Sequence, residues 1–216
     1  MKLSLKEFEK RYQNDELSIA FVGMSNIGKS YTAKRLAISH KFTLIEIDKI
    51  IWESLEHDSM EAFAAWQGHP YTAGYKAREN KSIELEAQAT LKALNQIEGN
   101  CLLDTTGSVI YTGDEVLNPI TSNCLVVHIK AEVSDLERLK KDYFAVPKPL
   151  VWKDSYIEKD GLSREETIRT CYPNLLQSRK NAYESMADVT LASSFILAKE
   201  TNEDNIIKAI KSQLTN

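Results

Sequence analysis

The chain has 216 residues, of which 43% are hydrophobic and 27% are charged, and its formal net charge at pH 7 is −4. These values are typical of a single well-packed globular domain, and the small negative charge gives no support to binding of nucleic acids or anionic membranes. We find neither a signal peptide nor an apolar stretch long enough to cross a bilayer, so we expect a cytoplasmic protein without membrane contacts.

The first expected element is a short helix that precedes the main domain. Ser4-Leu5-Lys6-Glu7 has the pattern of a capping box, in which a serine hydroxyl and a glutamate side chain cap the first helical turn. We expect this helix to end near Asn14, and we treat residues 1–16 as an appended helix and residues 17–216 as the main domain.

The next segment contains a complete phosphate-binding loop, or P-loop. Residues 17–22 form a short apolar run that predicts a buried strand, and Gly23-Met24-Ser25-Asn26-Ile27-Gly28-Lys29-Ser30 follows it as G-x-x-x-x-G-K-S. A helix is expected from Lys29 to about His40. A glycine-rich turn between a strand and a helix N-terminus directs backbone N–H groups and the positive end of the helix dipole at phosphate oxygens. The sequence therefore predicts a nucleotide site, with ATP and Mg²⁺ as cofactors.

The residues expected to contact the nucleotide belong to this loop and to the first turn of the helix. The Lys29 ammonium would lie on the bridge between the β- and γ-phosphates, and the Ser30 hydroxyl would coordinate Mg²⁺. The full expected set is Gly23, Ser25, Asn26, Ile27, Gly28, Lys29, Ser30 and Tyr31.

Strands and helices alternate along the rest of the chain. Four further strands are expected at residues 42–47, 101–103, 124–129 and 188–192. Helices are expected at residues 49–67, 73–96, 112–120 and 203–214, and also after Ser134 and after Ser163. Pro173 can kink or divide the helix that begins after Ser163.

This alternation predicts an α/β fold of the P-loop NTPase type. We expect a three-layer sandwich, with a five-stranded parallel sheet and helices on both faces. Residues 145–162 contain two prolines and few large apolar side chains, so we expect them to form a mobile lid.

Acidic residues follow two of the expected strands, where ligands of parallel sheets bind. Glu46 and Asp48 stand two apart at the end of the second strand, so we expect their side chains on the same face. One would reach Mg²⁺ and the other would accept a hydrogen bond from a substrate hydroxyl. Asp104 ends the third strand and is another candidate for the magnesium shell. The sequence does not decide between Glu46 and Asp104.

Together these motifs resemble the shikimate kinase family. The resemblance covers residues 17–192 and includes the P-loop, the Glu46-x-Asp48 pair, the turn ending in Gly107-Ser108-Val109 and the run from Arg179 to Asp188. The family has an Asp-x-Asp pair after its second strand, a triple-glycine turn after its third, and an Arg-x-x-x-Tyr-Glu-x-x-Ala-Asp run near its end.

The resemblance implies roles at individual positions. Asp48 would hold and polarise the accepting hydroxyl, and Arg179 would clamp a substrate carboxylate with its planar guanidinium. Lys148, where the family has an arginine in its lid, would neutralise charge on the transferring phosphoryl group; the alternative is a solvated loop lysine. Lys76 stands where the family has a second substrate-binding arginine. Gly107 would let the backbone approach the substrate closely.

Two departures from the family pattern bear on the acceptor: the glycine turn is Thr105-Thr106-Gly107, and Lys76 replaces an arginine. We predict a small-molecule kinase, a phosphotransferase that uses Mg-ATP to phosphorylate a hydroxyl of shikimate or of a similar hydroxylated carboxylic acid. The alternatives are a nucleoside or nucleotide kinase, and a catalytically inactive nucleotide-binding regulatory protein of the same fold. The sequence identifies no protein partner.

Overall fold

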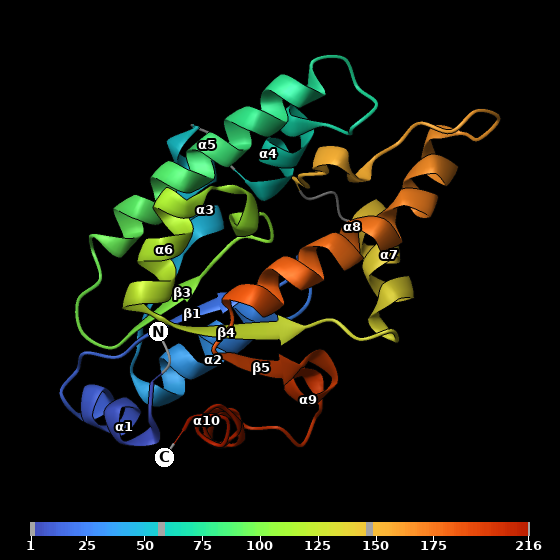
Figure 1. The fold of residues 1–216 in the computed structure, drawn as a ribbon. Coiled ribbons are helices and arrows are strands. Elements are labelled where there is room, and N and C mark those ends of the chain that lie inside the picture. Colours follow the sequence, from blue (N-terminus) through green and yellow to red (C-terminus); the bar gives the residue numbers. More distant parts are fainter. Residues whose placement is uncertain (1–2, 56–58, 146–148, 216) are drawn as a thin grey trace.

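The computed structural model describes residues 3–55, 59–145 and 149–215, and one sheet lies at the centre of the fold (Figure 1). Its strands are β1 (Ser18–Val22), β2 (Thr43–Glu46), β3 (Cys101–Asp104), β4 (Leu125–Lys130) and β5 (Val189–Ala192). They are all parallel and lie in the order β2-β3-β1-β4-β5. The expected five-stranded parallel sheet is therefore confirmed.

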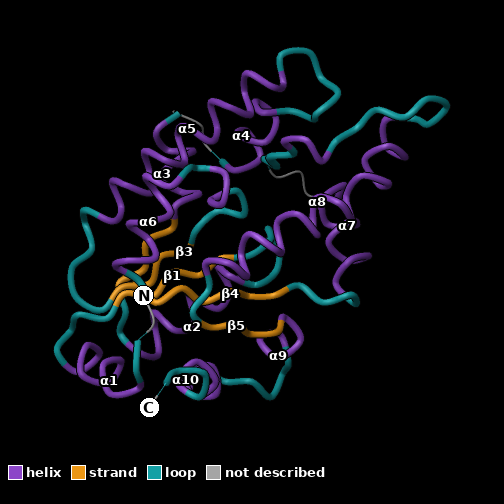
Figure 2. Tube along the Cα trace, in the orientation of Figure 1, coloured by secondary structure: helices purple, strands orange, loops and turns teal. Residues whose placement is uncertain are grey.

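Helices cover both faces of this sheet, as the colouring by secondary structure in Figure 2 shows. The α-helices of the described residues are α1 (Leu5–Gln13), α2 (Lys29–His40), α3 (Ile47–Ser54), α4 (Met60–Gln67), α5 (Tyr75–Leu94), α6 (Asp114–Asn123), α7 (Asp135–Ala145), α8 (Arg164–Met186), α9 (Ser193–Leu197) and α10 (Glu203–Lys211). In Figure 1, α6 and α8 lie above the sheet, and α2 and α10 lie below it. Across the described ranges, no helix has both the length and the hydrophobicity needed to cross a membrane.

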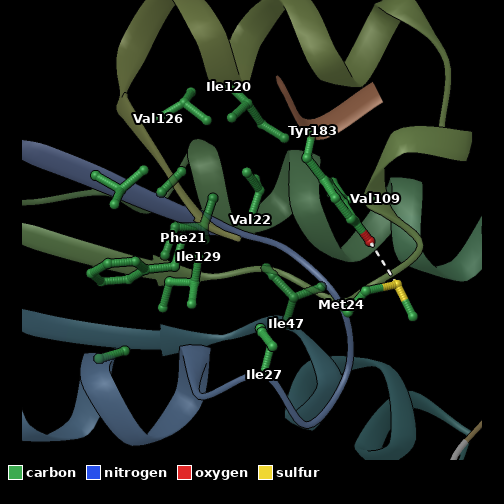
Figure 3. Packing of buried hydrophobic residues seen from close by; sticks show 14 of the residues in the cluster. Phe21, Val22, Met24, Ile27, Ile47, Val109, Ile120, Val126, Ile129 and Tyr183 are labelled. Atoms are coloured by element: carbon green, nitrogen blue, oxygen red, sulfur yellow. Dashed lines mark hydrogen bonds between the residues drawn. The ribbon is translucent and has the colours of Figure 1, made fainter. Parts of the chain in front are cut away.

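The central strands are buried because helices pack on both sides of them. All five residues of β1 and all four of β3 are buried, as is typical of parallel strands with continuous apolar sequences. Phe21 pairs with Asp104, and Asp104 pairs with Glu46. The loops that follow β1, β2 and β3 therefore leave the same edge of the sheet. Figure 3 shows apolar side chains at this edge, among them Ile27 and Ile47.

Helix α1 packs on the domain. Phe8 is buried in the main core. The backbone N–H of Leu5 donates to the carbonyl oxygen of Thr215 at 2.7 Å, and Lys211 Nζ of α10 lies 2.7 Å from a carboxylate oxygen of Glu9. The described part of the appended helix thus shares the core of the main domain.

The helix expected at residues 49–67 is divided into α3 and α4. Pro173 does not divide the helix that follows Ser163. Helix α8 continues through Pro173, because Tyr172 and Leu175 are buried on either side of it and their packing outweighs the backbone hydrogen bond that proline removes.

The segment after α7 packs more closely than its sequence suggested. Residues 150–152 are buried, and the Trp152 ring meets the rings of Tyr143 and Tyr172 edge-on. The expectation of a loop with little apolar packing is therefore wrong at these positions, since aromatic side chains of α7 and α8 supply a partner surface. Residues 157–162 are exposed, as expected.

Candidate active site

The loop from Gly23 to Ser30 connects β1 to α2, and its backbone is arranged as an anion-binding turn. Met24 and Ile27 are buried and anchor it to the core. Gly28 is the N-cap of α2 with φ of +109°, a left-handed conformation that favours glycine, and no side chain caps the helix. The N–H groups of the first turn of α2 are thus available to an anion at the positive end of the helix dipole.

Lys29, Ser30 and Asp104 lie together at the start of α2. Lys29 is buried, and its Nζ donates to the carbonyl oxygen of Met24 at 3.1 Å. Burial raises the pKa of Asp104, although the Lys29 charge and a hydrogen bond with the Ser30 side chain act in the opposite direction. Within the described part of the chain, Asp104 Oδ1 has no hydrogen-bond partner. A buried carboxylate oxygen beside a serine hydroxyl is a suitable ligand set for a divalent cation.

Glu46 and Asp48 do not share a face of a strand, contrary to our expectation. β2 ends at Glu46, and Asp48 already belongs to the first turn of α3, where side chains follow helical rather than alternating directions. Glu46 Oε1 forms an ion pair of 2.8 Å with Lys34 Nζ of α2. Glu46 is thus neutralised by a lysine, whereas Asp104 is the carboxylate that contacts Ser30.

Among the pockets that adjoin the P-loop, two are also lined by Asp48. The large pocket, of about 470 Å³, is lined by the loop, the first turn of α2, Asp48, Arg138 and Leu197. The narrow pocket is lined by residues of α3, α4, α5 and the turn after β3, and its free volume of about 20 Å³ holds roughly one water molecule. A larger molecule therefore enters the narrow pocket only if its walls move apart. Ser25 and Asp48 line both pockets, so the two spaces meet at these side chains.

Arg138 and Leu197 border the large pocket, and sequence reasoning missed both. Arg138 Nη1 on α7 donates to the carbonyl oxygen of Asn26 at 2.9 Å, and its Nη2 donates to Asp135 at 2.7 Å. Leu197 on α9 is 44% exposed. A fixed guanidinium plane and an apolar side chain are suitable neighbours for an aromatic base. No local motif marks either residue, because each reaches the P-loop from a distant helix.

The narrow pocket contains a second carboxylate, that of Glu86 on α5. Glu86 is 2% exposed, and it accepts hydrogen bonds from the Thr106 hydroxyl and from Ser108 Oγ, the latter at 2.6 Å. Burial raises the pKa of Glu86 to about 7, and the nearby Asp48 charge raises it further. The two hydrogen bonds and the Arg179 charge lower this pKa, but they do not outweigh burial. The pocket thus holds a carboxyl group that takes up a proton near neutral pH.

Sequence reasoning also missed Glu86, although the sequence carries a signal for it. Glu79, Ser82, Ile83 and Glu86 all belong to the buried stripe of α5, since residues three or four apart share a helix face. A carboxylate within such a stripe is a candidate functional group. Ser82 Oγ donates to Gln67 Oε1 at 2.6 Å and adds further polar groups to the wall of the narrow pocket.

Arg179 reaches the narrow pocket, but backbone carbonyls hold its guanidinium. Its exposure is 0%; Nη1 donates to Gly107 O at 2.7 Å and Nη2 donates to Val151 O at 2.5 Å. Tyr183, one turn later on α8, also donates to Gly107 O. A Cβ added at Gly107 would lie 2.9 Å from Ser25 Oγ. Gly107 therefore permits close approach of two protein loops, in addition to bordering the pocket.

Lys76 does not reach the narrow pocket. It lies in the first turn of α5, its side chain is 61% exposed, and its Nζ is 3.2 Å from Glu79 Oε2 beside a separate surface pocket. This position does not support the expected contact with substrate, because Lys76 lines the separate pocket and is not part of the narrow one. Lys148 lies outside the described residues, so its role stays a prediction.

Glu79 joins the segment after α7 to α5. Its Oε1 accepts hydrogen bonds from the backbone N–H groups of Trp152 at 2.6 Å and Lys153 at 2.9 Å, and from the Tyr75 hydroxyl at 2.8 Å. Burial alone would raise the pKa of Glu79, but these hydrogen bonds hold it below its ordinary value. The wall of the narrow pocket that contains Val151 is thus anchored to α5.

Comparisons with known proteins agree with the fold. The sequence profile of the shikimate kinase family matches residues 25–215. Shikimate kinase from Bacteroides thetaiotaomicron has a similar structure, with a TM-score of 0.62 and 14% identity over 89% of this chain and 95% of that chain. Shikimate kinase from Acinetobacter baumannii in complex with shikimate has a TM-score of 0.58 and 15% identity, over 91% of this chain and 92% of that chain. The Aquifex aeolicus shikimate kinase has a TM-score of 0.56 and 19% identity, over 91% of this chain and 95% of that chain. No curated protein sequence matches significantly. At these identities the structural likeness establishes the fold.

Proposed function

Because the chain belongs to the shikimate kinase family, we propose that it is a kinase that transfers the γ-phosphoryl group of ATP to a hydroxyl group of a small molecule. One observation carries this proposal: Ser25 and Asp48 line both the large pocket and the narrow pocket. A nucleotide in the large pocket and an acceptor in the narrow pocket would therefore meet at the P-loop, as in-line phosphoryl transfer requires.

The large pocket has the groups that a nucleoside triphosphate needs. The N–H groups at the start of α2 and the Lys29 ammonium would bind the phosphates. Arg138 and Leu197 would flank the base. Positive charge fixed in advance at the phosphates would stabilise the charge that develops during transfer.

Ser30 and Asp104 fit a bound Mg²⁺. The unpartnered Oδ1 of Asp104 and the adjacent Ser30 hydroxyl are oxygen ligands of the kind that this ion prefers. Groups of three or more His, Cys, Asp or Glu that could hold a metal are absent from the described ranges, which suits an ion held by few side chains together with phosphates and water. When bound, Mg²⁺ would offset phosphate charge.

Asp48 is the residue that we assign to the acceptor. Its carboxylate would accept a hydrogen bond from the attacking hydroxyl and take the proton as the new oxygen–phosphorus bond forms. The bond between the γ-phosphorus and the bridging oxygen breaks in the same step, and ADP is the leaving group. Lys148, by resemblance, would approach the transferring group from the lid.

Two alternatives stay open. A nucleotide kinase would grip a phosphorylated acceptor with several lid arginines, and the sequence has no arginine between Arg138 and Arg164. An inactive regulatory protein would bind ATP without turnover, and the intact Lys29, Ser30 and Asp48 argue against it.

The test is ADP release from Mg-ATP with shikimate and a panel of hydroxy acids, sugars and nucleosides. Lys29→Ala and Asp48→Asn should each lower kcat/KM by about 100-fold or more. Lys49→Ala and Glu53→Gln, on the exposed side of α3, are matched controls that should change it less than about twofold. Binding of ATP without acceptor-stimulated turnover would contradict the kinase function and favour the regulatory alternative.

A further inference from the structure

The narrow pocket differs in charge from a site built to hold a carboxylate. Among the described residues that line it, Asp48 and Glu86 are carboxylates and Arg179 is a cation. A carboxylate that enters a pocket with little water requires a cation that other groups do not already neutralise. Among these described lining residues the charges are balanced, or negative, before any acceptor arrives.

The one cation in this described lining is already occupied by the protein. Arg179 donates from Nη1 to Gly107 O and from Nη2 to Val151 O. A guanidinium recognises a carboxylate best through two parallel N–H bonds, and here the backbone takes one bond from each terminal nitrogen. The third nitrogen, Nε, is buried without a partner in the described residues. Because both terminal nitrogens already bind carbonyl oxygens, the guanidinium presents no unoccupied pair of terminal nitrogens to a carboxylate.

Glu86 is fixed in an orientation that lets it accept further hydrogen bonds. Thr106 donates to Oε1 and Ser108 donates to Oε2. Each oxygen of a carboxylate has about two acceptor sites, so each retains one for a ligand. Gln67 and Ser82 add an uncharged amide and hydroxyl to the same pocket.

We propose that the acceptor is an uncharged polyol, and that Glu86 selects it by accepting a hydrogen bond from a hydroxyl other than the one phosphorylated at Asp48. This inference rests on the proposed kinase function and deepens it. It departs from the expected hydroxylated carboxylic acid, because a carboxylate in the narrow pocket would lie beside Glu86 and would face no free guanidinium fork. The raised pKa of Glu86 is consistent with this, since a pocket rich in positive charge would lower it.

The test compares acceptors in pairs that differ only in a carboxylate. The pairs are shikimate and its hydroxymethyl analogue, glucuronate and glucose, and glycerate and glycerol. Binding to the full chain is measured by calorimetry with Mg²⁺ and a non-hydrolysable ATP analogue, and turnover is measured as ADP release. In at least one pair we expect the uncharged member to bind, with kcat/KM about 100-fold or more above its acid partner.

Glu86→Gln tests the residue itself. At pH 8, above the pKa of Glu86, it should raise KM for the preferred polyol about tenfold, because the hydroxyl loses a charged acceptor. The preference for polyol over acid should shrink by about the same factor or more, while the Kd for ATP stays unchanged. Glu84→Gln, on the exposed face of the same helix, is the matched control and should change neither value. Ser108→Ala removes one hydrogen bond from Glu86 without removing its charge, and it should act in the same direction if Glu86→Gln fails to fold.

The outcomes separate the two proposals. Tighter binding of the acid members, or no binding by any uncharged member, would overturn the polyol assignment. An unchanged preference in both Glu86→Gln and Ser108→Ala would overturn the role of Glu86. Polyol binding that depends on Glu86 but yields no ADP would support the assignment of the pocket while contradicting the kinase function.

Discussion

The buried carboxyl group of Glu86 predicts how stability depends on pH, without reference to any substrate. Its pKa in the folded protein is about 7, compared with an ordinary value of 4.5. Between these pH values the folded state binds more protons at this site than the unfolded state does. The free energy of unfolding therefore falls as pH rises through this window. Glu86→Gln removes this contribution, because glutamine does not titrate.

The size of the effect follows from the two pKa values. The interval from 4.5 to about 7 corresponds to roughly 3 kcal/mol, at about 1.4 kcal/mol for each pH unit. Solvent does not screen this contribution appreciably, since Glu86 is 2% exposed. We expect the stability of Glu86→Gln, relative to the unmodified protein, to rise by about this amount from pH 4 to pH 8. At the acid end both side chains are neutral, and the difference there reports only the exchange of a carboxylic acid for an amide.

The assay is urea unfolding of both proteins across this pH range. His128 titrates in an overlapping window with the opposite sign, because burial lowers its pKa from 6.5 to about 4 and the folded state loses stability as pH falls through that window. His128 is present in both proteins, so its contribution cancels in the difference. The control Glu84→Gln should give a difference that is constant within about 0.5 kcal/mol.

Two results would refute this reasoning about Glu86. A difference that does not change with pH would mean that Glu86 titrates alike in the folded and unfolded states. A difference that falls as pH rises would mean that Arg179 and the two hydroxyl donors outweigh burial.

Substitutions at three other buried positions should change stability, ATP affinity or kcat/KM. Glu79→Gln should lower stability by about 1–3 kcal/mol and speed amide exchange at residues 152 and 153, whose N–H groups lose a charged acceptor; unchanged exchange would contradict the anchoring role. Gly107→Ala should raise the Kd for ATP about fivefold or more in calorimetry, because its Cβ would lie 3.0 Å from the Ser25 backbone nitrogen. An unaltered Kd would show that the P-loop accommodates the added Cβ without a loss of ATP affinity. Asp104→Asn should lower kcat/KM by about 100-fold or more and raise the Mg²⁺ concentration needed for activity, without lowering the melting temperature. A lower melting temperature with unchanged kcat/KM would instead assign Asp104 a structural role.

The parts of the fold and site that were predictable from the sequence depend on local patterns. The P-loop needs only consecutive residues between a strand and a helix, and both flanks are where the sequence placed them. The parallel sheet follows from short apolar runs separated by helical patterns, and Asp104 is found at the end of β3. Its contact with Ser30 required the three-dimensional register that aligns β3 with β1.

The features that sequence reasoning missed depend on contacts between distant segments. Glu86 becomes a pocket residue only because α5 packs beside the turn that carries Ser108. Trp152 is buried because aromatic rings of two helices surround it, which a single loop sequence does not reveal. Asp48 was placed on the wrong element, because a four-residue strand passes directly into a helix without a turn signal. Lys76 was placed by resemblance, and it lines a separate surface pocket instead.

Helix α8 contacts both sides of the site through two side chains one turn apart. Arg179 and Tyr183 both donate to Gly107 O, and both lie within 4.0 Å of the sulfur of Met24 in the P-loop, a contact that Figure 3 shows for Tyr183. A displacement of α8 therefore alters the loop beside the large pocket and the turn beside the narrow pocket together. Because coupling between two binding sites is reciprocal, the nucleotide and the acceptor would change each other's affinity by the same factor. If the proposed nucleotide and acceptor bind here, this helix predicts that the equilibrium affinity for each depends on the presence of the other.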